Sequence, residues 1–184
     1  MIYSLSLQTA GLVTGAVLLV AHFMVLRHAG ESRRWLKQFP RSRAMGTLLI
    51  ALATIWSFLL IWGIDLGEFA RLRNVMLGAI VAGAILAWIY VEEFLAVRAI
   101  GMLALLAAEP LLEAAFMRHE TTRLLLVLLA YVWIINGLFW VGMPWLMRDQ
   151  IGWLTAKTPR YRVAAWVGLL YSVALIVCAV FLWK

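Results

Sequence analysis

Two carboxylates inside one apolar segment are the residues best suited to chemistry in this chain. Glu109 and Glu113 are four residues apart, which places them on one face of a helix. An ionised carboxylate inside a bilayer costs several kcal/mol unless it is paired or hydrated. Pro110 directly follows Glu109 and removes a helical hydrogen bond there. The pattern therefore indicates a candidate proton- or cation-binding position at Glu109, with Glu113 beside it.

Two further polar residues belong to this candidate intramembrane site. Arg98 precedes Glu109 by eleven residues, which returns it to within about 20° of the same helix face. The rise between the two is roughly 16 Å, too far for a direct salt bridge. Asn136 lies near the centre of the next apolar run, where an amide can hydrogen-bond to a neighbouring helix.

The same residues also have a purely structural interpretation. Glu113 can extend its side chain toward Arg118 or Arg123 beyond the end of its helix. Glu109 can hydrogen-bond to a neighbouring helix, and Asn136 can join two helices without binding any ligand. The sequence leaves both interpretations open.

The amino-acid composition predicts what kind of secondary structure carries these residues. The chain has 184 residues, of which 65% are hydrophobic and 14% are charged, whereas soluble domains are about half apolar and about a quarter charged. A soluble fold is therefore excluded. Backbone N–H and C=O groups in lipid must be paired within their own segment, so continuous apolar runs form helices. The sequence predicts an all-α, polytopic integral membrane bundle, with residues 1–184 forming one transmembrane domain and no soluble domain.

Six apolar runs are long enough to cross a bilayer, which takes about 20 residues. They cover residues 5–26, 44–64, 75–91, 94–116, 124–146 and 163–183. The third and fourth runs are separated by no turn-forming residue. One helix over 75–116 would be about 63 Å long, roughly twice the hydrocarbon thickness. A break is therefore predicted at Glu92 and Glu93. The alternative is five spans, with the run 94–116 re-entrant or interfacial.

The distribution of basic residues predicts the orientation. The net charge is +7, and the first, third and fifth loops hold eleven of the 16 basic residues. The positive-inside rule places these loops in the cytoplasm and both termini on the outer side. The cytoplasmic or plasma membrane is the simplest location.

The first loop, over residues 27–43, is the most basic segment. It contains six basic residues: Arg27, Arg33, Arg34, Lys37, Arg41 and Arg43. Basic residues beside a span attract anionic lipid head groups, so the lipid bilayer and its anionic head groups are the predicted partners of this loop. Residues 31–39 are predicted to form a short helix on the inner surface, or else a solvated loop. Nucleic acid is not expected, because no basic face exists apart from the membrane flanks.

Tryptophan and glycine indicate how the spans are anchored and packed. Five of the ten Trp residues fall near span ends and are predicted interface anchors: Trp35, Trp62, Trp145, Trp153 and Trp183. Small residues recur at helical spacing in the pair Gly11 and Gly15 and in the series Ala79, Gly83 and Ala87. Such faces allow close helix contact, and we expect both to pack within the chain.

Metal and cofactor chemistry is not indicated. Cys178 is the single cysteine, so no cysteine-based metal site can form. His22 and His28 are predicted near the inner face, with His28 in the loop, and His119 at the outer end of the fourth run, whereas bis-histidine ligation of haem needs two imidazoles facing one iron at one depth.

Three functions remain compatible with the sequence. The first is a non-catalytic accessory or structural component of a membrane system, because no convergent polar site is evident. The second is a small proton- or ion-coupled transporter or channel component that uses Glu109. The third is a membrane-embedded enzyme, which requires several titratable groups within hydrogen-bond reach. Whether the protein pairs with other membrane proteins or with copies of itself is left open.

Overall fold

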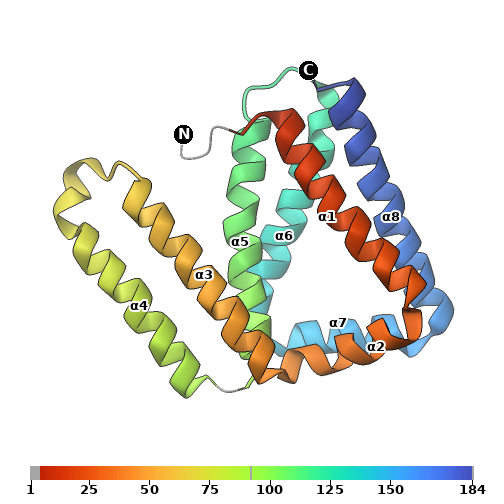
Figure 1. Cartoon of the computed structure of the whole chain (residues 1–184), viewed down its shortest axis with the longest axis horizontal. Coiled ribbons are helices and arrows are strands. Elements are labelled where there is room, and N and C mark those ends of the chain that lie inside the picture. The colour runs from red at the N-terminus through yellow and green to blue at the C-terminus, as the bar shows by residue number, and fades with distance from the viewer. Residues whose placement is uncertain (1–4, 92, 184) are drawn as a thin grey trace.

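The computed structural model describes residues 5–91 and 93–183, and every regular element in that part of the chain is helical (Figure 1). The α-helices are α1 (Leu7–Arg27), α2 (Ala29–Gln38), α3 (Arg43–Gly63), α4 (Arg73–Tyr90), α5 (Leu95–Ala115), α6 (Leu124–Gly142), α7 (Trp145–Ala156) and α8 (Thr158–Phe181). Three short 3-10 helices join them: η1 (Phe39–Arg41), η2 (Gly67–Leu72) and η3 (Thr121–Arg123).

Six helices in the described part of the chain are long and apolar enough to cross a membrane: α1, α3, α4 (extended by η2), α5, α6 and α8. The predicted all-α membrane fold with six spans is therefore confirmed. Helix α5 has 21 residues, about 31 Å at 1.5 Å per residue. It is as long as the helices on either side of it, which favours six spans over the five-span alternative.

The predicted break between the third and fourth runs is present. Helix α4 ends at Tyr90 and α5 begins at Leu95. Phe94 precedes α5 in the left-handed region, with φ 59°, a conformation that non-glycine residues rarely adopt. Glu93 is exposed in this connection, and Glu92 lies outside the described residues. The chain therefore reverses between the end of α4 and the start of α5, in the connection that contains Glu93.

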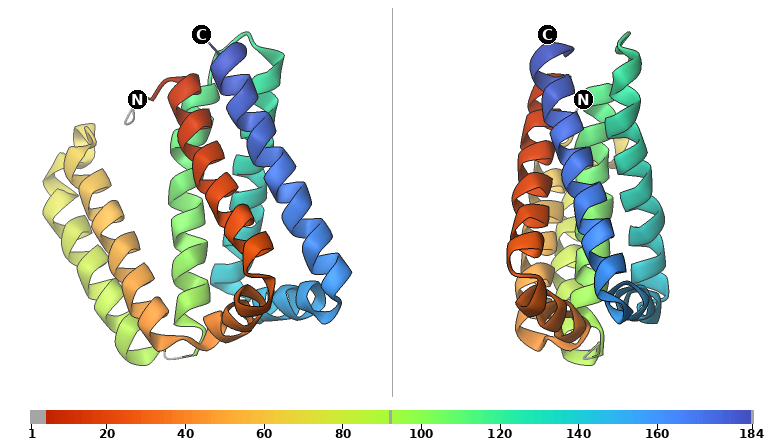
Figure 2. Two further views of the ribbon diagram at one scale, coloured as in Figure 1. Left: turned by 45° about the vertical axis from the view of Figure 1, so that its right-hand side comes forward. Right: turned by 90° about the vertical axis from the view of Figure 1, so that its right-hand side faces the viewer.

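The spans form a four-helix group with a hairpin at its side. Helix α1 packs along α8 and α5 packs along α6, while α3 and α4 form the hairpin next to α5 (Figures 1 and 2). Helix α3 approaches α5 closely at Gly46, where an added Cβ would lie 3.1 Å from the amide nitrogen of Ala96. From there the two helices diverge toward the end of α3 (Figure 1). The main core lies within the four-helix group, with Leu126 and Leu175 fully buried.

Glycines set the closest helix contacts in the four-helix group. Added Cβ atoms at Gly11 and Gly15 would lie 2.3 Å from the Trp183 ring and 2.7 Å from Ile176, respectively. This first small-residue face therefore packs within the chain, as expected. The second does not, because a Cβ added at Gly83 would have no atom of another element within 4 Å. Helix α3 packs along the other side of α4, with Ala84 half-buried at that contact.

The tryptophans fall into two groups. Trp35, Trp62, Trp145 and Trp153 are exposed, which suits side chains that anchor in the head-group layer. Trp183 differs from the prediction, because it is 2% exposed and its indole N–H donates to the Thr122 hydroxyl at 2.8 Å. The missing side chain at Gly11 makes room for this ring, so Trp183 fastens the end of α8 to the protein rather than to lipid.

Two short helices, α2 and α7, lie across one end of the spans (Figures 1 and 2). The predicted surface helix over 31–39 is present as α2. The sequence does not predict helix α7, because its pattern indicates one continuous span over residues 124–146, whereas the chain breaks at Met143 and Pro144. Proline favours the first turn of a new helix. Met147 and Ile151, one turn apart, are then buried in a cluster that also holds Phe39 and Val97.

Polar contacts fasten α2 to the start of α8. Arg33 of α2 donates to the Thr158 hydroxyl at 2.9 Å and to the Thr155 carbonyl oxygen. The Tyr161 hydroxyl donates to the Ser32 hydroxyl at 2.9 Å. Each hydrogen bond contributes about 0.5–1.5 kcal/mol, so α2, α7 and α8 form one connected layer at this end of the molecule.

Cysteine labelling tests the orientation of this layer. We expect a membrane-impermeant thiol reagent applied outside cells to modify His119→Cys and to leave Arg34→Cys unmodified. Arg34 is exposed on α2, and His119 is exposed in the connection between α5 and α6, at the opposite end of the spans. The native Cys178 is buried and supplies a low background. Labelling of both positions from the same side would contradict the six-span topology.

Candidate functional site

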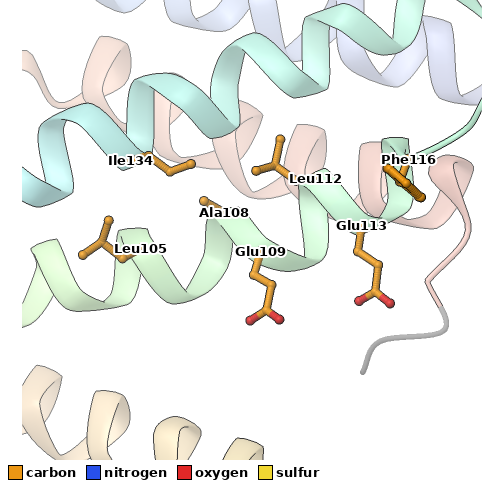
Figure 3. A pocket seen from close by; sticks show the side chains of 7 residues that line it. All are labelled: Leu105, Ala108, Glu109, Leu112, Glu113, Phe116 and Ile134. Carbon is orange, nitrogen blue, oxygen red and sulfur yellow. The ribbon is translucent and has the colours of Figure 1, made fainter. Parts of the chain in front are cut away.

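Glu109 and Glu113 lie in the last third of α5. The helix continues through Pro110, and the side chains on either side of Glu109, Ala108 and Pro110, are buried. Figure 3 shows both carboxylates pointing the same way, away from α6. The four-residue spacing thus places the two acids on one face, as expected from helical geometry.

An open groove of about 610 Å³ runs beside these carboxylates. It is lined by Leu105, Ala108, Glu109, Leu112, Glu113, Phe116 and Ile134, and we call it the Glu109 groove. Its lining residues extend along α5 from Leu105 to Phe116, the residue that follows the helix, which is about 16 Å or three helical turns. The two carboxylates are its polar lining residues.

Glu109 is exposed on a helix of membrane-spanning length. It lies six residues before the end of α5, about 9 Å from that end. Among residues 5–91 and 93–183, none forms a hydrogen bond or ion pair with its carboxylate. Glu113 is half-buried and does have an interaction of its own. Glu109 is therefore the carboxylate that this fold presents outward within the membrane.

Arg98 does not meet Glu109. It lies in the first turn of α5, at the opposite end from the two acids, and its Nη1 donates to the Val141 carbonyl oxygen at 3.2 Å. Val141 belongs to the last turn of α6, where carbonyl groups lack helical partners and carry partial negative charge. Arg98 therefore caps the end of α6.

Asn136 is part of a polar cluster between α6 and α7. Its Nδ2 donates to the Val132 carbonyl oxygen at 2.8 Å, and its Oδ1 accepts from Gln150 Nε2 at 3.3 Å. Gln150 Oε1 in turn accepts from Trp140 Nε1 at 3.0 Å. Gln150 and Trp140 were not predicted as partners of Asn136, because their contact depends on α7 folding back against α6.

The four candidate residues thus separate into two sets. Glu109 and Glu113 face the Glu109 groove, whereas Arg98 and Asn136 make contacts with the end of α6 and with α7. No group of three or more His, Cys, Asp or Glu side chains in the described part of the chain could hold a metal ion. The arrangement offers an outward-facing carboxylate in an apolar groove, rather than a cluster of reacting groups.

No protein-family model matches this chain, and no curated protein or solved structure is significantly similar to it. A helical membrane bundle by itself does not define an activity. Function has to be inferred from the Glu109 groove and from the charged residues at the membrane boundaries.

Proposed function

We propose that this protein is a non-catalytic component of a membrane assembly, and that the Glu109 groove receives a transmembrane helix of a different protein carrying a Lys or Arg side chain. The observation that carries the proposal is the exposed Glu109 carboxylate on a spanning helix. An ionised carboxylate in lipid has a high free energy unless an opposite charge or water reaches it. A cation from a partner helix supplies that charge.

The shape of the groove supports a helical occupant. The lining residues Leu105, Ala108, Leu112 and Phe116 repeat at three- and four-residue intervals along α5, and such a row forms the seam into which a neighbouring helix packs. The seam is three turns long. Small side chains such as Ala108 permit close approach of helices in lipid. At about 4 Å and an effective dielectric constant near 20, opposite charges attract by about 4 kcal/mol.

A second copy of this chain fits the groove less well. Most basic residues of the described spanning helices lie near an end, as with Arg27 and Arg43, whereas Arg73 lies six residues inside the span Gly67–Tyr90. A copy in the same membrane orientation would bring Arg73 nearest to the depth of Glu109, about 9 Å inside the end of α5, but Nη2 of Arg73 already donates to the Ile64 carbonyl oxygen of its own chain at 2.7 Å. The cation is instead expected from a different chain.

The charge distribution supports a location for the assembly. The eleven basic residues of the first, third and fifth loops belong to the end that carries α2 and α7. We assign this end to the cytoplasm and the protein to the cytoplasmic or plasma membrane, following the positive-inside rule.

Photocrosslinking tests the docking proposal. A photoreactive amino acid at Leu112, in the groove, should crosslink the full-length protein in cells to a second protein. The linked segment should be a spanning helix that contains Lys or Arg. Val177 is the matched control, because it lies at similar depth on α8 and faces outward. Equal crosslinking at both positions, adducts with lipid alone, or a crosslink to a second copy would overturn the proposal.

A further inference from the structure

A second pocket lies at the other end of the molecule, beside the starts of two spans. Its volume is about 440 Å³, and it is lined by Arg41, Arg43, Glu93, Phe94 and Arg148. Arg41 and Arg43 flank Ser42, the N-cap of α3, whereas Arg148 comes from α7, more than a hundred residues later. We call it the triple-arginine pocket.

The pocket favours an anion. Three arginines and one glutamate, Glu93, line it, and Arg43 has an interaction of its own. Arg43 is the first residue of α3 and Arg148 lies in the first turn of α7, where the helix dipole disfavours positive charge and favours negative charge. Helix α5 begins beside the pocket without a side-chain cap, and unpaired N–H groups at helix starts are donors to anions.

Asp149 orients Arg148 without filling the pocket. It accepts from Nε of Arg148 at 3.0 Å and lies 3.0 Å from Nη2, so a single carboxylate oxygen holds one edge of the guanidinium. Asp149 is not among the residues that line the pocket. Arginine binds phosphate through paired N–H donors with defined geometry.

The depth of the pocket identifies the class of ligand. Helices α3 and α5, both of spanning length, begin there, so the pocket lies at the boundary of the apolar layer. Trp145, in the first turn of α7, is exposed, as expected of a head-group anchor. Lipid phosphate groups lie at this level of a bilayer.

We propose that the triple-arginine pocket binds a phosphate group, supplied by the head group of an anionic lipid such as phosphatidylglycerol. The bound phosphate links the start of α3 to α7, two elements distant in the sequence. The pocket lies at the start of α5, whereas the Glu109 groove lies along its second half, so the two proposals can fail independently.

Lipid titration of the purified full-length protein tests the pocket. Binding of phosphatidylglycerol, phosphatidylcholine and inorganic phosphate is followed in neutral detergent by native mass spectrometry. Arg41→Gln should weaken phosphatidylglycerol binding at least tenfold, and Arg148→Gln should do the same. Arg162→Gln is the matched control, because Arg162 is exposed at the same end, outside the pocket; it should change binding less than twofold.

The outcomes separate the sources of phosphate. Tight binding of phosphatidylglycerol that is lost in Arg41→Gln supports a lipid ligand, whereas inorganic phosphate that binds equally well and is lost in the same variant supports a phosphate site with a soluble ligand. Arg41 is exposed and its side chain makes no hydrogen bond within the described residues, so replacing it should leave the fold intact. An equal loss in Arg162→Gln, or full binding in both pocket variants, would overturn the proposal.

Discussion

Replacing Gly137 by alanine should markedly lower the thermal stability of the detergent-solubilised protein, while the same change at Gly83 should leave it unchanged or raise it. A Cβ at Gly137 would lie 2.9 Å from the Gly101 carbonyl oxygen and 3.0 Å from Cγ of Leu105. The first contact is with backbone, which cannot rotate away. Helices α5 and α6 must therefore separate along their shared core.

The expected size of the effect follows from overpacking. Extra methyl groups in a close-packed core typically cost about 1–3 kcal/mol, and Gly137→Leu should cost more than Gly137→Ala. The reciprocal change Gly101→Ala should act in the same direction, because its Cβ would lie 3.0 Å from the Gly137 carbonyl oxygen.

Gly83 provides the control for this stability prediction. It lies within the spanning helix α4, where an added Cβ would have no atom of another element within 4 Å, and alanine is favoured over glycine in helices by about 1 kcal/mol. Thermal melts followed by size-exclusion chromatography measure both variants. Equal stability of Gly137→Ala and wild type would show that α5 and α6 do not pack at this distance.

Reversing the charge of Glu109 should abolish the partner crosslink that we expect at Leu112. Removing one member of a desolvated charge pair typically costs about 2–5 kcal/mol, and lysine adds repulsion, so Glu109→Lys should weaken association well beyond tenfold. Reversing the partner's cation to Glu should restore the complex. Glu68→Lys is the matched control, because Glu68 is exposed in η2, outside the groove.

Restoration by the double reversal is the decisive measurement, because loss of folding cannot be rescued from another chain. A Glu109→Lys variant that keeps its partner would exclude the carboxylate from docking. Proton flux in reconstituted vesicles provides a separate criterion. If the wild type conducts protons and Glu109→Gln does not, transport replaces docking as the function of this carboxylate.

The spans were predictable because lipid leaves few options for an apolar chain. Continuous runs about 20 residues long had to be helices, and the run from 75 to 116 was too long to stay unbroken, so the connection near Glu93 followed from length alone. The surface helix α2 was one of the two structures predicted for residues 31–39. Each of these features is local in the sequence.

The rest depended on contacts between distant segments. Helix α7 could not be recognised from the sequence, because its apolar residues continue the apolar run of α6 and only Pro144 marks the break between the two helices. Trp183 is buried because Gly11 leaves space for its ring. Gly83 faces outward because the other side of α4 packs against α3. No local sequence pattern predicts that Arg148 lines the same pocket as Arg41 and Arg43. Residue spacing defined the face of Glu109, but not that this face would point outward.

The pairing of α1 with α8 has a consequence for biosynthesis. Translation produces α1 first and α8 last among the described helices. The surface of α1 around Gly11 and Gly15 therefore has no α8 to pack against until every intervening span has been inserted. Until the ribosome has released α8, that surface faces lipid or an insertion factor. Shielding of the nascent chain during this interval, rather than the formation of any single helix, is then the step on which correct assembly depends.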